Sequence, residues 1–192
     1  MEIADRKAIL QSKYPFEYVT CYIAKRYDNL QDWQVANQEA ALRFMDGKLT
    51  EKDKKDILSA VKRTLAKYRR KKGEWVVSFI PASTNERYIK RYRELTTYLR
   101  TNLEIPVAYF GVCIRKEGTK FSSSSEIIVE DNLYVKRHLF RVKDRNIILI
   151  DDNITTGRTL RTVGDFLMSE GANRICGVIY AMTIHPDLPV KQ

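Results

Sequence analysis

Short apolar runs recur along the second half of the chain, and the stretches between them place apolar residues on one side of a helix. Uninterrupted apolar runs of this length are typical of parallel strands that are covered on both faces. The elements expected from this pattern are strands at 75–80, 106–114, 147–150 and 174–182, one helix after Asn85, and another carrying Leu160 to Leu167 and ending near Gly171. Their order predicts an α/β fold with a parallel sheet and helices on both sides.

The first part of the chain follows a different pattern. Asp32 is expected to cap one helix, and Thr50 to begin a capping box that opens a second. The segment 18–23 is rich in strand-forming residues instead. We predict a mostly helical N-terminal region, residues 1–73, packed on a core made of residues 74–192.

One long connection interrupts the core pattern. Residues 115–126 are polar, include four consecutive serines, and are expected to form a mobile loop. A helix is expected at 126–137 and a short strand at 138–142.

Composition excludes several classes of protein. Of the 192 residues, 44% are hydrophobic and 30% are charged, which is ordinary for a soluble globular chain. No stretch approaches the roughly 18 apolar residues that a membrane span needs, and the N-terminus shows no signal-peptide core. The three cysteines are far apart, which favours reduced thiols in a cytoplasmic protein without a membrane partner.

The formal net charge of +10 is concentrated near the N-terminus, where residues 1–72 carry 17 Lys and Arg against 10 Asp and Glu. A basic body attracts polyanions, either nucleic acid or a metabolite that carries a diphosphate. The basic run 67–72 could contact nucleic acid, but cations are also favourable at a helix C-terminus. Nucleic acid is therefore an open alternative and not the favoured partner.

The most informative segment covers residues 146–159. An apolar run, Ile147 to Ile150, precedes Asp151 and Asp152, and a hydroxyl-rich loop with Gly157 then opens a helix. Backbone N–H groups and the helix dipole at such a loop can hold a phosphate. Carboxylates at the strand's end can accept hydrogen bonds from sugar hydroxyls. A turn with one capping Asp or Thr explains neither the two acids nor the three threonines, so the segment predicts a site for a phosphorylated sugar.

This segment resembles the phosphoribosyl diphosphate signature of type I phosphoribosyltransferases: an apolar run, Asp-Asp, one or two variable residues, and Thr-Thr-Gly-x-Thr. Asn153 departs from it, because the family usually has Val, Ile or Thr there. Ile80-Pro81 followed by Arg87 and Arg91 is most similar to the ComF-like branch. That branch's Arg-Gly-Phe-Asn-Gln element and zinc ribbon are absent from this chain.

The resemblance implies a type I phosphoribosyltransferase-like sheet flanked by helices, with a helical N-terminal extension. It also implies a Mg²⁺-dependent transfer of ribose 5-phosphate from phosphoribosyl diphosphate to a small nitrogenous acceptor. Asp151 and Asp152 would be catalytic, with no direct metal ligand and Mg²⁺ held mainly through the diphosphate and nearby waters. The residues expected to bind substrate are Thr155, Thr156, Gly157, Arg158, Thr159, Ala82, Ser83, Thr84, Arg87 and Arg115.

A second hypothesis belongs to another class. The same fold could serve a regulatory protein that senses phosphoribosyl diphosphate and binds nucleic acid without catalysis. The basic N-terminal third and Asn153 favour this alternative, while the Asp-Asp and Thr-Thr-Gly segment is needed by both. A homo-oligomer is compatible with either hypothesis.

Overall fold

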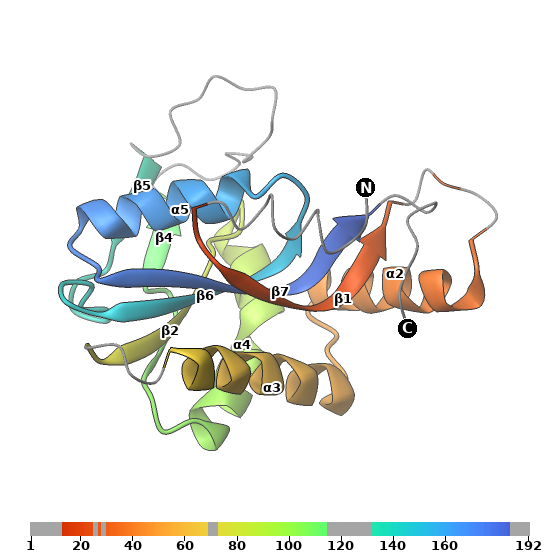
Figure 1. Cartoon of the computed structure of the whole chain (residues 1–192), viewed down its shortest axis with the longest axis horizontal. Coiled ribbons are helices and arrows are strands. Elements are labelled where there is room, and N and C mark those ends of the chain that lie inside the picture. Colours follow the sequence, from red (N-terminus) through yellow and green to blue (C-terminus); the bar gives the residue numbers. More distant parts are fainter. Residues whose placement is uncertain (1–12, 25–26, 28–29, 69–72, 115–131, 185–192) are drawn as a thin grey trace.

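The computed structural model describes residues 13–24, 27, 30–68, 73–114 and 132–184. Its main feature is a five-stranded parallel sheet with the order β1-β7-β6-β2-β3 (Figure 1). The strands of this sheet are β1 (Phe16–Ile23), β2 (Trp75–Phe79), β3 (Val107–Ala108), β6 (Asn146–Ile154) and β7 (Arg174–Ile184). The predicted parallel sheet is confirmed.

Helices cover both faces of this sheet. On one face α5 (Arg158–Ser169) packs on Ile147 and Leu149 of β6. On the other face, Ile148 and Ile150 contact apolar residues of three helices (Figure 1). These helices are α2 (Asp32–Met45), α3 (Glu51–Lys67) and α4 (Asn85–Asn102). Because both faces of β6 are covered, its side chains at 147–150 are all fully buried, which explains the uninterrupted apolar run.

The N-terminal region contributes to the sheet as well as to the helical layer. β1 pairs with β7 in parallel, from Phe16 opposite Gly177 to Ile23 opposite Ile184, and forms an edge of the sheet. The predicted capping box at the start of α3 is confirmed, since Thr50 N–H donates to Asp53 Oδ2 at 2.9 Å and Asp53 N–H to Thr50 Oγ1 at 3.2 Å. α2 differs slightly from expectation, because Gln31 and not Asp32 caps it.

The expected single strand at 106–114 is wrong. The chain turns after β3, and Phe110 has a φ of +55°, which a strand does not allow. The following strand, β4 (Val112–Ile114), pairs antiparallel with β5 (Leu133–Val135) in a separate two-stranded sheet. The apolar run is therefore shared between two sheets.

Two further expectations fail in the segment before β6. β5 is a strand where a helix was expected, and residues 138–142 form no strand. Phe140 and Val142 are buried against the α5 side of the sheet without joining a ladder, so burial alone produced the strand-like pattern. β6 itself is longer than expected, because Asp151 to Ile154 continue to pair with β7.

Two predicted features lie outside the described residues: the basic run at 69–72 and the loop 115–126, which includes Arg115. Within the described ranges, no helix is both long and apolar enough to cross a membrane.

Candidate active site

The two predicted ligand loops follow neighbouring strands. β2 and β6 are adjacent in the sheet, and Ile80 N–H donates to Ile150 O at 2.9 Å just beyond the last paired residues. Ala82–Thr84 continue from β2, and Asp151 follows Ile150 directly. Ligands of parallel α/β sheets bind outside the carboxyl ends of the strands. The structure thus brings the two predicted loops to one such edge.

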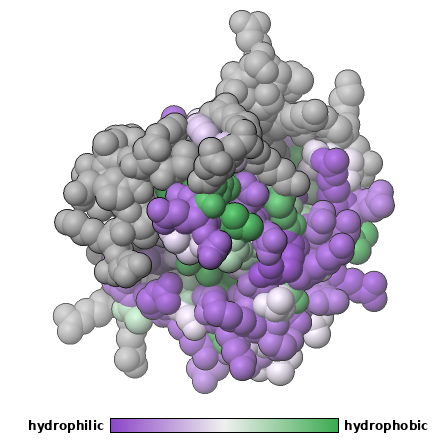
Figure 2. All heavy atoms as spheres, turned by 90° about the vertical axis from the view of Figure 1, so that its right-hand side faces the viewer, coloured by the Kyte–Doolittle hydropathy of each residue, from purple (hydrophilic) through white to green (hydrophobic). Residues whose placement is uncertain are grey.

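This edge is largely hydrophilic. Figure 2 views the molecule from the side toward which the arrowheads of β1 and β7 point in Figure 1, and among the coloured residues hydrophilic ones predominate, with a few hydrophobic ones near the centre. A hollow of about 210 Å³ lies at the end of β6. Its walls are formed by Leu160 and by residues of the signature: Asp151, Asn153, Ile154, Thr155, Thr156, Gly157, Arg158 and Thr159.

The loop at this hollow is shaped by one glycine. Gly157 caps α5 with a φ of +76°, a conformation that side chains with a Cβ rarely adopt. Arg158 N–H donates to Thr156 Oγ1 at 3.3 Å, and the Thr156 side chain is exposed. The first N–H groups of a helix have no partner within the helix, and α5 therefore presents donors and a positive dipole end beside two threonine hydroxyls. This arrangement suits a phosphate group.

The acid pair lies beside this loop. Asp151 is 7% exposed, and its Oδ1 accepts the N–H of Asp152 at 2.9 Å. Burial raises the pKa of Asp151 well above its ordinary value, the charge of Asp152 raises it further, and the Arg91 guanidinium acts in the opposite direction. Asp152, unlike Asp151, is not among the residues that line the hollow. The two acids are thus adjacent but differently placed.

Arg91 is a site residue that the sequence did not assign. Its Nη1 lies 2.8 Å from Asp152 Oδ2, and both side chains are only 15% exposed. Its guanidinium carbon also lies 5.8 Å from the ring centroid of Tyr92, whose buried hydroxyl has no hydrogen-bond partner among the described residues. Arg87 and Arg91 are four residues apart on α4 and so share a helix face. This spacing is the sequence feature that could have indicated Arg91 as a site residue beside Arg87.

The other loop expected to bind substrate, Ala82–Thr84, is an ordered helix cap. Thr84 caps α4 by accepting Arg87 N–H at 3.2 Å, and Arg87 Nη1 donates to Ser83 Oγ at 3.1 Å. Arg87 is exposed, whereas Ala82 is 7% exposed and faces the core. These residues do not line the 210 Å³ hollow, so any ligand that uses both loops must extend from that hollow toward the start of α4.

Asn153 belongs to a short polar chain. Thr183 Oγ1, from β7, donates to Asn153 Oδ1 at 3.0 Å and also lies 3.0 Å from Thr155 Oγ1. The residue that departs from the family pattern therefore links the signature loop to the neighbouring strand.

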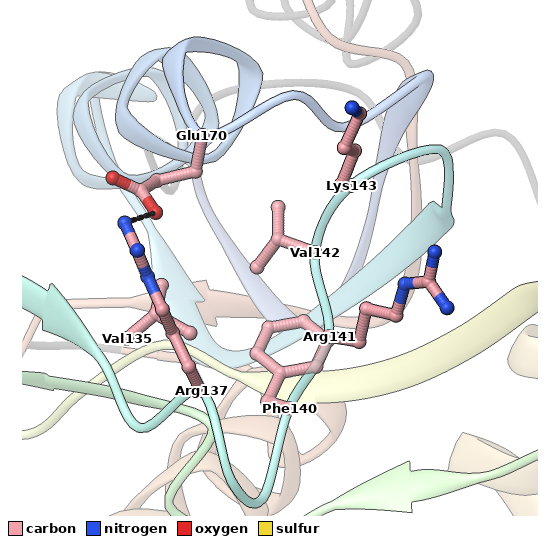
Figure 3. Close-up of a pocket in the computed structure, with 7 residues that line it drawn as sticks. All are labelled: Val135, Arg137, Phe140, Arg141, Val142, Lys143 and Glu170. Atoms are coloured by element: carbon pink, nitrogen blue, oxygen red, sulfur yellow. Dashed lines mark hydrogen bonds and ion pairs between the residues drawn. The ribbon is translucent and has the colours of Figure 1, made fainter.

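A second hollow, of about 340 Å³, lies at the opposite edge of the sheet (Figure 3). It is formed by residues before the start of β6 and by Glu170 after α5, with Arg137 Nη2 donating to Glu170 Oε2 at 3.1 Å. Neither predicted loop reaches it. The larger hollow is therefore separate from the acid pair.

Among the described residues, no three His, Cys, Asp or Glu side chains lie close enough together to bind a metal ion with protein ligands only. Asp151 and Asp152 supply hard oxygen donors, which are the ligand type that Mg²⁺ prefers. The pair thus fits a Mg²⁺ ion held jointly with substrate phosphates, and it does not fit a Mg²⁺ ion held by the chain alone.

Three curated relatives share part of this sequence, and all three carry the name bifunctional protein PyrR. The protein from Streptococcus sanguinis is 31% identical over 91 residues, 47% of this chain and 47% of its own length. The protein from Ligilactobacillus salivarius is 29% identical over 92 residues, 47% and 49% of the two chains. The chain thus spans about half the length of these two relatives. The match to the protein from Pediococcus pentosaceus is 30% over 126 residues, covering 64% and 68%.

Solved structures with a similar fold include a hypoxanthine phosphoribosyltransferase from Trypanosoma cruzi, at 14% identity and a TM-score of 0.42, covering 70% of this chain and 78% of that one. An adenine phosphoribosyltransferase from Saccharomyces cerevisiae aligns at 15% identity and a TM-score of 0.41, covering 70% of each chain. None of these relatives is described as ComF-like, so that finer resemblance stays a prediction.

The model of the phosphoribosyl transferase domain matches residues 52–185, well over half of the chain and the whole of the acid pair and its loop. The chain therefore belongs to the phosphoribosyl transferase domain family.

Proposed function

We propose that this protein is a Mg²⁺-dependent phosphoribosyltransferase that moves ribose 5-phosphate from phosphoribosyl diphosphate to a small nitrogenous acceptor. The observation that carries the proposal is the hollow at the end of β6, which is lined both by Asp151 and by the threonine loop at the start of α5. A phosphate at a helix N-terminus beside a carboxylate is the arrangement that a ribose 5-phosphate requires.

The roles follow from the charges that appear during the reaction. The acceptor nitrogen forms a bond to C1 of the ribose as the bond from C1 to the diphosphate oxygen breaks, and diphosphate leaves with the electron pair. The ribose ring gains positive charge on the way. Asp151 would bind ribose hydroxyls and stabilise this charge, with Asp152 beside it. Thr155 to Thr159 would hold the 5′-phosphate, whose charge does not change.

The leaving group would extend toward the start of α4. Ser83, Thr84 and Arg87 lie at that N-terminus, where the helix dipole favours negative charge. Mg²⁺, carried by the diphosphate and its waters near Asp151 and Asp152, would neutralise the charge that develops on the leaving group. Arg115, which follows β4 in the sequence, is also proposed to bind the donor.

A second candidate function is donor binding without turnover, as in a regulatory protein. Two observations favour it: Asp152 is paired with Arg91 outside the hollow, and the relatives named above are called bifunctional. Nucleic acid would then be the second partner, with the basic N-terminal part as its contact.

Donor binding is the first prediction. At about 100 times its Kd, phosphoribosyl diphosphate with Mg²⁺ should stabilise the native state by roughly 2.7 kcal/mol, because it binds only the folded chain. For a chain of this size the midpoint of thermal unfolding should rise by about 5–10 °C. Calorimetric titration gives the Kd, and diphosphate release across a panel of bases and amines gives turnover. Binding with turnover supports the transferase, binding alone supports the regulator, and no binding at millimolar donor rejects both.

A further inference from the structure

The ion pair between Arg91 and Asp152 joins the two halves of the proposed donor site. Arg91 lies on α4, which the proposed diphosphate loop Ala82–Thr84 directly precedes, and Asp152 lies on β6 next to the proposed ribose-binding acid, Asp151. In the described ranges, the ion pairs of the structure include no other between α4 and β6. The distance of 2.8 Å makes this a charge-assisted hydrogen bond as well.

The Arg91–Asp152 ion pair is mostly buried, and this strengthens the interaction. Both side chains are 15% exposed, so water screens the interaction much less than at a typical surface pair. The Arg91 Nε and the Tyr92 hydroxyl are buried and have no partner among the described atoms. The Arg91 guanidinium therefore lies between the Asp152 carboxylate, at 2.8 Å from Nη1, and the Tyr92 ring.

The acid pair needs a nearby cation. Asp151 and Asp152 are adjacent, and Asp151 is almost fully buried, so two negative charges would repel each other in a poorly screened place. Arg91 opposes this repulsion, and it acts on both carboxylates. Asp152 Oδ1 also accepts the Asn153 N–H at 2.7 Å, so Asp152 uses one oxygen for its own strand and the other for Arg91. Without Arg91, Asp152 Oδ2 would lose its cation and the repulsion between the two acids would be unopposed.

We propose that Arg91 is a positioning residue, which holds Asp152 and thereby fixes the acid pair relative to the diphosphate loop of α4. This inference rests on the proposed function, since it assumes that the acids and that loop bind one donor molecule. Arg91 acts through Asp152 and need not touch the substrate.

The test is a double-mutant cycle with Arg91→Met and Asp152→Asn, with donor Kd by calorimetry and kcat by diphosphate release. We expect each single variant to lower kcat by about 10- to 100-fold, since small displacements of positioned groups cost this much. The donor Kd should rise about three- to tenfold. The double variant should be no worse than the poorer single variant, because both changes remove one interaction. Arg91→Lys should recover part of the loss by restoring the charge.

The controls separate positioning from folding. Arg93→Met removes an exposed arginine from the same helix and should leave kcat and Kd unchanged. The double variant removes both charges of the ion pair, so it stays informative if Arg91→Met alone, which leaves Asp152 unpaired, is too unstable to fold. A change in unfolding temperature without a change in Kd or kcat would reduce Arg91 to a structural role and overturn the proposal. Independent, multiplying effects of the two substitutions would overturn it too.

The outcome also distinguishes this proposal from the function on which it rests. If the wild-type protein binds the donor without turnover, the transferase proposal fails. The double-mutant cycle is then measured in donor Kd alone, and non-additive effects on Kd still support Arg91 as a positioning residue. If the wild-type protein binds no donor, both proposals fail, and this is seen before any variant is made. Donor binding that is indifferent to Arg91 and Asp152 defeats the assignment of Arg91 alone.

Discussion

Asp151→Asn is expected to lower kcat by about 10²- to 10³-fold while raising the donor Kd less than tenfold. The reason is that the ribose ring carries positive charge only in the transition state, so the carboxylate contributes more there than in the ground state. Asn keeps the size and one acceptor oxygen of Asp151 and removes its charge. A developing cation beside the buried acid also favours the ionised form, against the burial that raises its pKa.

Thr156→Val provides the matched contrast in the same hollow. The 5′-phosphate is charged in the ground state and the transition state alike, so the loss of one hydroxyl should raise the donor Kd about tenfold and leave kcat within about threefold. Thr97→Val, on the exposed face of α4, should change neither constant. Steady-state kinetics and calorimetry on the three variants check this. An Asp151→Asn protein with normal kcat and poor donor binding would contradict the proposed division of roles.

Local sequence predicted the part of the site that is continuous in the chain. The Ile147 to Ile150 run, the acids and the threonine loop follow one another in a strand-loop-helix unit, so their order alone placed them together. The extent of β6 could not be read in the same way. Asp151 and Asp152 stay in the strand because their backbone pairs with β7, an interaction that the apolar pattern does not encode.

The missed elements depend on contacts between distant segments. β3, β4 and β5 have two or three residues each, too few to show a period of two. Arg91 is mostly buried and Arg87 is exposed because of the way α4 packs on the sheet, with Tyr88, Tyr92 and Leu95 buried. The sequence does not show which of the two arginines is buried. Asp152 is the partner of Arg91 because the first turns of α4 lie beside the end of β6. Helical periodicity placed both arginines on one face but could not identify this partner.

Gly47→Ala is expected to be the most destabilising single change that the structure indicates. Gly47 lies between α2 and α3 with a φ of +68°, and an added Cβ would lie 1.8 Å from Lys90 O, a backbone atom that cannot turn aside. Left-handed backbone alone costs a residue with a Cβ about 1–2 kcal/mol. Displacing α4 adds to this, so we expect a loss of at least about 3 kcal/mol, or roughly 6–12 °C in the unfolding midpoint.

Gly171→Ala is the control for backbone strain without a clash. Its φ is +92°, but the nearest atom to an added Cβ is the Lys143 Cγ at 3.4 Å, an ordinary contact with a flexible side chain. Its loss should be about 1–2 kcal/mol. Because Lys90 directly precedes Arg91, Gly47→Ala should also weaken donor binding, whereas Gly171→Ala, beyond the far end of α5, should not. Chemical unfolding and donor titration measure the two effects separately. Equal losses of stability, or donor binding insensitive to Gly47→Ala, would show that the N-terminal helices do not position α4.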